Sequence, residues 1–401
     1  MKIKIERGLP SGCFIAPPSK SYAHRLLIAC ALSDGECTVS KVASSEDMLA
    51  TLDCIRALGT HASFERGKVH FSKNDPQKYT GIFNCRESGS TLRFFIPIAL
   101  LRGGVCEFRG TKTLMSRGIS VYEDIFRTQG IGLKRTDTSL ILEGKLHPDT
   151  FEVRGDISSQ FITGLLLALP LLEGDSTIKI TTPLESAPYV DMTIECLLSL
   201  GIEIKWISDT ELYIKGNQKY KCCDAIVEGD FSNSAFLDAF GVLGAPVCVK
   251  GLNFYSRQGD KVYKEFFRQI QAGYFEADIS ECPDLGPVLF ALCAVHEGGY
   301  ITGTRRLKIK ESDRAMAMAQ ELSKLGIRLD VYENAVKINK GTLKAPNVPL
   351  CSHNDHRIVM ALAVLATLTG AIIDGAQAVK KSFPTFFDVL KRHGVKCEVI
   401  K

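Results

Sequence analysis

Six glycines, each between an amphipathic helical pattern and a strand pattern, constrain the fold of this 401-residue chain more than any other feature. A glycine directly after a helix adopts the left-handed backbone conformation that other residues resist, so each one predicts a helix end. Their spacing is nearly constant apart from one shorter interval, which indicates a structural unit copied along the chain. The six are Gly59, Gly130, Gly201, Gly273, Gly326 and Gly394.

The second and third copies show the composition of the unit most clearly. The second has a helical pattern at 89–101, a strand at 105–109, a helix at 117–129 and a hairpin at 131–143. The third repeats this order at 158–172, 176–181, 189–200 and 202–215. With a strand before the first helix, the unit is β-α-β-α-β-β, the fourth copy being less regular and the fifth compressed. The first helices are apolar nearly all round, so we expect them inside, with the amphipathic second helices outside.

Each first helix follows a short loop, in most copies of small or polar residues, and these loops predict the type of ligand. The exposed N–H groups and partial positive charge of a helix N-terminus attract phosphate and carboxylate. Six such loops predict a protein that handles a highly charged small molecule. They lie at 19–21, 87–91, 158–160, 231–234, 282–284 and 353–357.

Composition excludes several classes of protein. The net charge is only +4 without a basic run, which argues against nucleic acid as the partner. The longest apolar stretches, 161–172 and 358–367, are too short to span a bilayer, and the first residues alternate like a strand rather than a signal peptide. The fourteen cysteines are scattered without a CxxC pair, so we expect free thiols in a reducing cytoplasm.

Positive residues gather near the loops, at Lys20, Arg25, Arg93, Arg117, Lys308, Lys310, Arg314, Arg357, Lys380 and Lys381. Single Lys and Arg residues are usually solvated, but a charge beside a buried helix must be paired or bind a ligand. For 354–357 (Asn-Asp-His-Arg) two interpretations stay open, an N-cap with a salt bridge or an anion site. Gly89 likewise serves either the backbone of a helix start or close contact with a ligand.

Seven motifs, in order along the chain, carry a resemblance to a known family. They lie at 18–25 (Pro-Ser-Lys-Ser-Tyr-Ala-His-Arg), 88–93 (Ser-Gly-Ser-Thr-Leu-Arg), 158–161 (Ser-Ser-Gln-Phe), 186–189 (Ser-Ala-Pro-Tyr), 310–314 (Lys-Glu-Ser-Asp-Arg), 354–357 (Asn-Asp-His-Arg) and 381–384 (Lys-Ser-Phe-Pro). From about residue 16 to 390 the chain resembles the 5-enolpyruvylshikimate-3-phosphate synthase family, the 3-phosphoshikimate 1-carboxyvinyltransferases.

The resemblance implies a fold and a reaction. The fold is the two-domain inside-out α/β barrel of six β-α-β-α-β-β repeats, three per domain. One domain would span 15–227 and the other 1–14 with 228–401, with the active site in the cleft between them. The reaction would transfer the enolpyruvyl group of phosphoenolpyruvate to the 5-hydroxyl of 3-phosphoshikimate and release phosphate, in the pathway to chorismate and the aromatic amino acids. The family implies a monomer that uses no metal and no organic cofactor.

The resemblance also assigns site residues by motif. Those expected to bind 3-phosphoshikimate are Lys20, Ser21, Arg25, Ser158, Ser159, Gln160, Ser186, Asp284 and Lys310. Those expected to bind phosphoenolpyruvate are Lys20, Gly89, Arg117, Gln160, Arg314, Arg357 and Lys381. The implied catalytic residues are Asp284, which would take the 5-hydroxyl proton, Glu311, beside the methylene carbon that becomes a methyl, and Lys20.

Some positions depart from the family pattern, and two alternatives remain open. Glu87 stands where Asn is common, Phe94 where Pro is frequent, and Arg306 near a position where Asn often contacts substrate. One alternative is UDP-N-acetylglucosamine enolpyruvyl transferase, which typically presents a reactive cysteine in a loop that here, at 110–116, contains none. The other is a non-catalytic scaffold that binds anions, against which Lys20, Asp284 and Glu311 argue.

Overall fold

The computed structural model of the chain describes residues 1–72 and 75–400, and it divides into two compact units. Unit 1 contains Met1–Ser19 and Gly229–Lys401, and unit 2 contains Lys20–Glu228. The expected division, after residues 14 and 227, differs from this one by a few residues at the first boundary. Residues 73–74 and 401, which fall within the expected domain ranges, lie outside the described part of the chain.

Unit 2 holds the first three repeats. Repeat one consists of α1 (Lys20–Ala31), β3 (Cys37–Ser40), α2 (Glu46–Ala57), β4 (His61–Glu65) and β5 (Lys68–Ser72). Repeat two consists of β6 (Ile82–Asn84), α3 (Gly89–Ala99), β7 (Val105–Arg109), α4 (Lys112–Ser116), α5 (Ser120–Gln129), β8 (Gly132–Arg135) and β9 (Ser139–Glu143). Repeat three consists of β10 (Thr150–Val153), α6 (Ser159–Ala168), β11 (Ser176–Ile180), α7 (Ala187–Ser199), β12 (Ile204–Ser208) and β13 (Glu211–Ile214).

Unit 1 holds the other three repeats. Repeat four consists of α8 (Phe231–Val242), β15 (Val247–Lys250) and α9 (Tyr263–Ala272). Repeat five consists of β16 (Phe275–Asp278), α10 (Gly286–Val295), β17 (Gly299–Thr302), α11 (Arg314–Lys324), β18 (Leu329–Val331) and β19 (Ala335–Ile338). Repeat six consists of β20 (Leu350–Cys351), α12 (His356–Thr369), β21 (Ala371–Asp374), α13 (Phe386–Arg392) and β22 (Cys397–Ile400).

Short 3-10 helices connect several of these elements: η1 (Pro76–Lys78), η2 (Leu169–Leu171), η3 (Gly259–Val262), η4 (Pro283–Leu285), η5 (Arg305–Ile309) and η6 (Ala376–Lys381).

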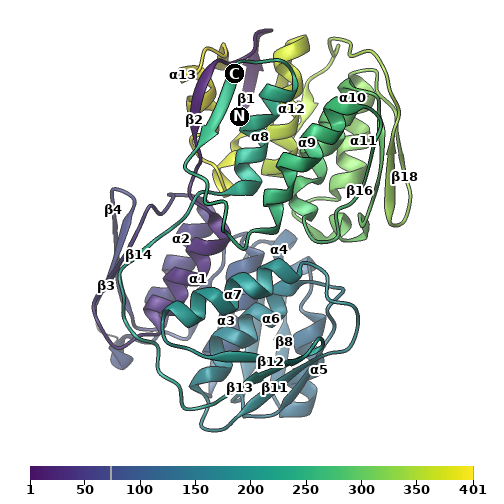
Figure 1. Cartoon of the computed structure of the whole chain (residues 1–401). Coiled ribbons are helices and arrows are strands. Elements are labelled where there is room, and N and C mark those ends of the chain that lie inside the picture. The colour runs from purple at the N-terminus through teal and green to yellow at the C-terminus, as the bar shows by residue number, and fades with distance from the viewer. Residues whose placement is uncertain (73–74, 401) are drawn as a thin grey trace. The chain divides into compact units, whose positions relative to one another are not determined.

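The sheets show how one repeat is built. In repeat two the order is β6-β7-β9-β8, with β6 and β7 parallel and the other pairs antiparallel. Repeats three and five each form their own four-stranded sheet with the same strand order. Repeat one takes its first strand from β14 (Ala225–Ile226), which follows repeat three in the chain. Repeat six takes a strand from β1 (Lys2–Ile5), which lies between β21 and β22, so both chain ends belong to one sheet of unit 1 (Figure 1).

Repeat four differs from the expected unit because it has no hairpin. The chain runs from α9 directly into β16, which pairs in parallel with β17 and so serves as the first strand of repeat five. What remains is a two-stranded sheet of β15 and β2 (Gly12–Ile15), the second strand of the N-terminal segment. The fourth copy was expected to be less regular than the others, and the loss of its hairpin is the form that this irregularity takes.

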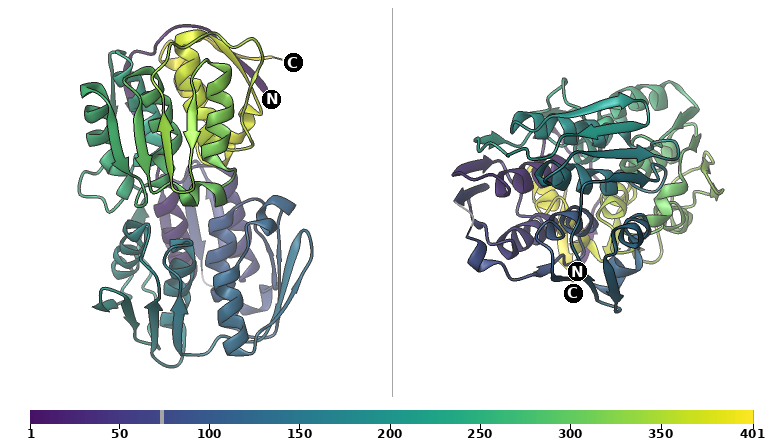
Figure 2. Two further views of the ribbon diagram at one scale, coloured as in Figure 1. Left: turned by 90° about the vertical axis from the view of Figure 1, so that its right-hand side faces the viewer. Right: turned by 90° about the horizontal axis from the view of Figure 1, so that it is seen from below.

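The first helices of the repeats lie inside, as their apolar sequences predict. In unit 1, α10 is buried along nearly its whole length and packs against α8 and α12 (Figure 1). The sheet of β16, β17, β19 and β18 covers α10 and α11 (Figure 2). The second helices, such as α5 and α9, bury one face only.

The six glycines that suggested the repeats all have positive φ angles. Five of them lie between 66° and 96°, a range that strongly favours glycine. Gly273 differs, with φ at 156°, so its helix ends without the left-handed residue that was expected. The helix expected at 117–129 is also interrupted, since Gly118 takes φ at 72° between α4 and α5.

The structure corrects the expectation that every cysteine is a free thiol. Cys13 and Cys248 form a disulfide that joins β2 to β15, where the two residues are direct partners in the parallel register. The sequence could not show this pair because the two positions are 235 residues apart. The other twelve cysteines are unpaired and mostly buried.

Candidate active site

Unit 1 contains a dense cluster of opposite charges at the N-termini of α11 and α12, which we call the Asp284 cluster. Asp284 follows Pro283 in η4, directly before α10, and its carboxylate faces three cations. Arg314 Nη1 donates to Asp284 Oδ1 at 2.8 Å, Arg357 Nη2 donates to Oδ2 at 3.0 Å, and Lys310 Nζ lies 3.4 Å from Oδ1. The expected residues Asp284, Lys310, Arg314 and Arg357 are thus brought together.

Arg314 occupies the centre of the Asp284 cluster, with its side chain 1% exposed. Besides Asp284 it binds Glu311, with Nη2 2.8 Å from Oε2, and Asp355, with Nε 2.8 Å from Oδ2. Burial alone would lower the pKa of Arg314, but the carboxylates of Asp355, Glu311 and Asp284 raise it above its usual value. Arg314 is therefore a permanent cation that holds the two expected catalytic carboxylates beside each other.

Burial and the neighbouring charges also set the protonation of Asp284 and Lys310. Burial alone would raise the pKa of Asp284, but Lys310, Arg357 and Arg314 lower it well below its usual value. Burial lowers the pKa of the Lys310 ammonium despite the attraction of Asp284. Asp284 is thus ionised at neutral pH, and the lysine beside it loses its proton more readily than an exposed lysine.

Arg357 has donors that the described protein groups do not use. Its side chain is 3% exposed, and within residues 1–72 and 75–400 its Nε and Nη1 atoms are buried without a hydrogen-bond partner. Buried donors of a native structure are nearly always satisfied, by protein groups, by water or by a ligand. The chemistry that these donors fit is that of an anion such as a carboxylate or phosphate.

Asp355 also belongs to the Asp284 cluster, although the sequence assigned it no role in binding or catalysis. Its carboxylate is completely buried, accepts a hydrogen bond from Arg357 N at 2.9 Å as the N-cap of α12, and pairs with Arg314. The N-cap with a salt bridge, one of the two interpretations left open for 354–357, is therefore correct for this residue. Lys381, at the end of η6, donates to Asn354 O at 2.6 Å and so lies beside the same loop.

Unit 2 holds the remaining expected residues. Lys20 begins α1, and its Nζ pairs with Asp47 Oδ2 at 2.8 Å, with both side chains less than one fifth exposed. This partner was not predictable from the sequence, since an acidic residue in the first turn of a helix such as α2 is common in helices generally.

The Arg25 side chain is more deeply buried than a phosphate clamp was expected to be. It is 3% exposed, and burial lowers its pKa to about 10. Its guanidinium donates to protein groups at 2.7–3.2 Å, namely Ser21 O, Thr193 Oγ1, Tyr189 O and Thr163 Oγ1. These bonds fix the guanidinium between α1, α6 and α7. Phe94, one of the departures from the family pattern, is buried with its ring 5.5 Å from the Arg25 guanidinium carbon.

Two further loops of unit 2 place expected residues at helix starts. Ser158 caps α6 by accepting from Gln160 N, and Gln160 in turn accepts from Arg93 Nη1 at 2.6 Å and donates to Ser90 Oγ at 2.9 Å. Ser159 is the first residue of α6 and is buried. Ser186 precedes α7 in the left-handed conformation, with φ at 60°, and is also buried.

Gly89 and Arg117 lie against each other at the start of α3. A Cβ on Gly89 would stand 2.9 Å from Arg117 Nη1, so only glycine leaves the guanidinium its present position. The sequence suggested that Arg117 opens a long helix, which was wrong, because Arg117 is the C-cap of the short α4. Two of the residues expected to bind phosphoenolpyruvate are therefore neighbours, although 28 positions separate them in the chain.

Two other departures from the family pattern have protein partners. Arg306 lies in η5 with its side chain buried, and it donates to Ser280 O. Glu87 accepts a hydrogen bond from Thr111 Oγ1 at 3.5 Å.

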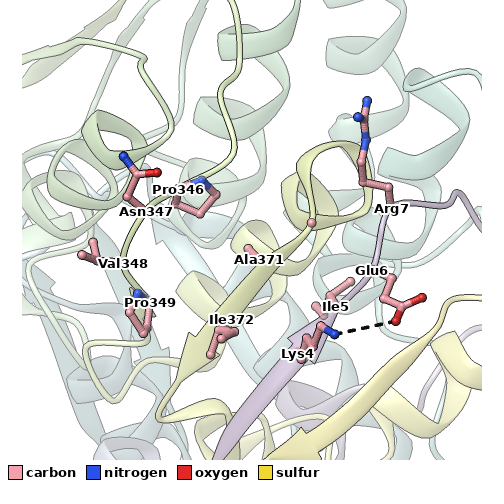
Figure 3. A pocket seen from close by; sticks show the side chains of 11 residues that line it. Lys4, Ile5, Glu6, Arg7, Pro346, Asn347, Val348, Pro349, Ala371 and Ile372 are labelled. Atoms are coloured by element: carbon pink, nitrogen blue, oxygen red, sulfur yellow. Dashed lines mark ion pairs between the residues drawn. The ribbon is translucent and has the colours of Figure 1, made fainter.

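Other features of the molecule lie outside these groups of residues. A cavity of about 560 Å³ in unit 1 is lined by β1, the loop at 346–349 and the start of β21, and contains no expected site residue (Figure 3). Among the described residues, no group of three His, Cys, Asp or Glu side chains is placed to hold a metal ion. In the same part of the chain, no helix is long and apolar enough to cross a membrane.

The fold is that of an α/β protein built like the enolpyruvyl transferases. The structure is similar to EPSP synthase from Acinetobacter baumannii, with a TM-score of 0.80 at 22% identity over all of both chains. It is also similar to the enolpyruvyl transferase NikO from Streptomyces tendae, with a TM-score of 0.77 at 16% identity, over 99% of this chain and 98% of that one. At these identities the matches establish the fold, and they confirm the expected fold class.

The chain belongs to the EPSP synthase (3-phosphoshikimate 1-carboxyvinyltransferase) family, whose model matches residues 10–390. The 3-phosphoshikimate 1-carboxyvinyltransferase of Clostridium kluyveri is 42% identical over 94% of each chain. That of Clostridium novyi is 41% identical over 98% of this chain and 97% of its own. These matches confirm the expected family and enzymatic class, and they do not favour the two alternatives.

Proposed function

We propose that the chain transfers the enolpyruvyl group of phosphoenolpyruvate to the 5-hydroxyl of 3-phosphoshikimate and releases phosphate. The observation that carries this assignment is the Asp284 cluster, in which three carboxylates and three cations meet at two helix N-termini. Two substrates that together carry two phosphates and two carboxylates need several cations to offset their repulsion. The buried Nε and Nη1 atoms of Arg357 are donors that fit one of these anionic groups.

The base in this mechanism is Asp284, whose basicity depends on the occupancy of the site. In the structure three cations hold its pKa low, which makes it a weak proton acceptor. Substrate phosphates and carboxylates compete for Lys310, Arg314 and Arg357, and their negative charge raises the pKa of a carboxylate beside them. Asp284 therefore becomes a useful base for the 5-hydroxyl proton once the substrates are bound.

The second carboxylate, Glu311, serves the other carbon of the reacting double bond. The 5-hydroxyl oxygen bonds to the central carbon of phosphoenolpyruvate while the methylene carbon gains a proton and becomes a methyl. In the second step the bond to phosphate breaks, the methyl loses a proton and the double bond re-forms. Arg314, bound to both carboxylates, fixes them on the same group of cations, as an addition followed by an elimination requires.

Unit 2 contributes the other half of the substrate contacts in this proposal. In this proposal 3-phosphoshikimate is bound by Asp284 and Lys310 of unit 1 and by seven residues of unit 2, namely Lys20, Ser21, Arg25, Ser158, Ser159, Gln160 and Ser186. Phosphoenolpyruvate is bound by Arg314, Arg357 and Lys381 of unit 1 and by Lys20, Gly89, Arg117 and Gln160 of unit 2. The active site would then lie between the two domains. Within unit 2, Gly89 adjoins Arg117 and Gln160 shares the network of Ser90 and Arg93, which supports the grouping of the residues assigned to phosphoenolpyruvate.

We also propose a monomer in the cytoplasm. The many unpaired cysteines favour a reducing compartment. Light scattering after size-exclusion chromatography measures the mass of the particle, and the mass of a dimer would contradict the proposed monomer. Localisation of a tagged chain in its own cells tests the proposed cytoplasmic location.

One assay tests the reaction. The chain is mixed with phosphoenolpyruvate and either 3-phosphoshikimate or UDP-N-acetylglucosamine, and released phosphate is measured. We expect release with 3-phosphoshikimate only. Release with the nucleotide sugar, or with neither acceptor, would overturn the proposal, and the Asp284→Asn variant controls for a contaminating phosphatase.

A further inference from the structure

The chain passes between the two units twice. In unit 1, the residues just before the first passage pair with the residues just after the second. The first passage leaves unit 1 after Ser19 and the second enters it at Gly229. Pro18 and Gly229 form an antiparallel bridge, and Asp230 N donates to Pro17 O at 2.8 Å. We call residues 16–19 and 229–231 the crossing segments.

The crossing segments are packed without spare room. A Cβ on Gly229 would stand 2.4 Å from Gly251 O and 3.0 Å from the Ala16 side chain. Contacts under 3.0 Å do not occur for real Cβ atoms, so glycine is required at this position. Two backbones and the turn after β15 therefore meet at one point of unit 1.

One buried side chain, that of Gln258, holds both crossing segments. It is 3% exposed and precedes η3. Its Oε1 accepts from Phe231 N at 3.0 Å and from Ser19 Oγ at 3.3 Å. Its Nε2 donates to Gly229 O at 2.8 Å and to Ser256 Oγ at 3.3 Å.

These four bonds use the full hydrogen-bonding capacity of a primary amide, which has two N–H donors and two acceptor sites on its oxygen. Replacement by any other side chain leaves at least one of the main-chain partners, Gly229 O or Phe231 N, buried and unsatisfied. The first passage leads directly to Lys20, which the proposed function places at the substrates. Lys20 follows Ser19 directly, and α8 begins at Phe231.

We propose that Gln258 is a positioning residue that fixes the two crossing segments as one hinge and thereby limits the orientations that residues of unit 2 can take toward the Asp284 cluster. This inference rests on the proposed function, in which Lys20 and Arg25 of unit 2 and Arg314 and Arg357 of unit 1 act on the same substrates. When the hinge is looser, a smaller fraction of the molecules has the binding-competent orientation, and the apparent affinity falls in proportion to that fraction. Once both substrates are saturating, the competent state is filled and turnover is maintained.

The test compares Gln258→Met with Gln218→Met. Methionine keeps the length of the side chain and removes all four hydrogen bonds at position 258. Gln218 is a matched control, since its amide also joins main-chain groups, Glu203 N at 2.7 Å, Glu203 O at 3.0 Å and Lys215 O at 2.8 Å, but entirely within unit 2. We expect both variants to lose thermal stability.

Kinetics separate the two variants. We expect Gln258→Met to raise the KM of both substrates about 3- to 30-fold while kcat stays within about threefold, and Gln218→Met to leave both constants unchanged. The amide of Asp230, which donates to Pro17 O, should also exchange its hydrogen faster in Gln258→Met alone. Equal KM values in Gln258→Met and the wild type, with only stability reduced, would overturn the proposal.

A second variant protects the test against misfolding. Gln258→Asn keeps an uncharged amide but is one methylene shorter, so it cannot reach all four partners at once and we expect a smaller rise in KM. If Gln258→Met does not fold, an unchanged KM in Gln258→Asn overturns the proposal. An inactive wild-type protein in the same assay would instead contradict the proposed reaction, so the two failures are distinguishable.

Discussion

Arg117 occupies the space that a side chain at position 89 would need. A Cβ built on Gly89 would lie 2.9 Å from Nη1 of Arg117, 3.0 Å from its Cζ and 3.1 Å from its Nη2. The atoms in the way are the far end of a flexible side chain rather than backbone. A methyl at position 89 is therefore accommodated by moving the guanidinium away, and not by distorting α3.

The first prediction follows from this contact. Gly89→Ala should displace the Arg117 guanidinium and raise the KM for phosphoenolpyruvate about 10-fold or more, since a hydrogen bond to a charged group contributes about 1.5–3 kcal/mol. Stability should change little. In a double-mutant cycle with Arg117→Ala, the second substitution should add almost nothing to the first. Fully additive effects on KM would contradict a mechanism through Arg117.

The second prediction concerns glyphosate, which in this family occupies the phosphoenolpyruvate site. We expect the wild type to be inhibited competitively with phosphoenolpyruvate. Gly89→Ala should weaken the binding of glyphosate more than that of phosphoenolpyruvate. Glyphosate is the longer of the two ligands and tolerates the loss of space less well. Inhibition constants and Michaelis constants of both enzymes decide this. Equal changes would contradict the steric argument, and resistance of the wild type would direct attention to Phe94, which packs on Arg25.

The third prediction concerns the buried pair of Asp355 and Arg314, whose side chains are 0% and 1% exposed. Asp355→Asn weakens one of the three carboxylate contacts of the buried Arg314, which keeps Asp284 and Glu311 as partners. The free energy of unfolding in urea should therefore fall by about 1.5–3 kcal/mol, the range for loss of a hydrogen bond to a charged group. Asp330→Asn, which breaks the more exposed pair with Arg328, is the control and should have little effect. Similar stabilities of the two variants would contradict this role of Asp355.

The fourth prediction concerns the dependence of stability on pH. Because the pKa of Asp284 is lowered in the folded protein, its carboxylate stabilises the fold above its unfolded pKa of about 3.9. This contribution is lost as the pH falls toward the lower folded value. The difference in free energy of unfolding between the wild type and Asp284→Asn should thus shrink between about pH 5 and pH 3. Urea titrations at several pH values measure it, and a constant difference would contradict the proposed ion pairs.

The sequence was sufficient for features that depend on local pattern. The glycine stops predicted the repeats, because a positive φ after a helix needs glycine whatever surrounds it. The motifs at 310–314 and 354–357 were both linked to anion binding, and the structure places Arg314 and Arg357 on one carboxylate.

Features that depend on contacts between distant elements were not predictable. The partner of Lys20, Asp47, lies on a different helix, and the Cys13–Cys248 pair depends on the register of β2 with β15. The missing hairpin of repeat four follows from the pairing of β16 with β17. None of these pairings leaves a local trace in the sequence, because each partner alone suits an ordinary helix or strand.

The last prediction tests the base directly. Asp284→Asn keeps the size of the side chain and removes the proton acceptor, so turnover should fall by about two to four decades. The three cations that pair with Asp284 become more available to substrate anions. The amide oxygen of Asn can still accept a hydrogen bond from the 5-hydroxyl, so the KM values should stay the same or decrease.

Asp278→Asn is the control for this experiment. Asp278 ends β16, six residues before Asp284, and its carboxylate accepts from Ser280 and Thr302 rather than from the cluster. Its replacement should leave both constants near their wild-type values. Near wild-type turnover in Asp284→Asn would mean that another group removes the 5-hydroxyl proton. A loss of turnover with a large rise in KM would mean that Asp284 acts chiefly by holding Arg314 and Arg357 in place.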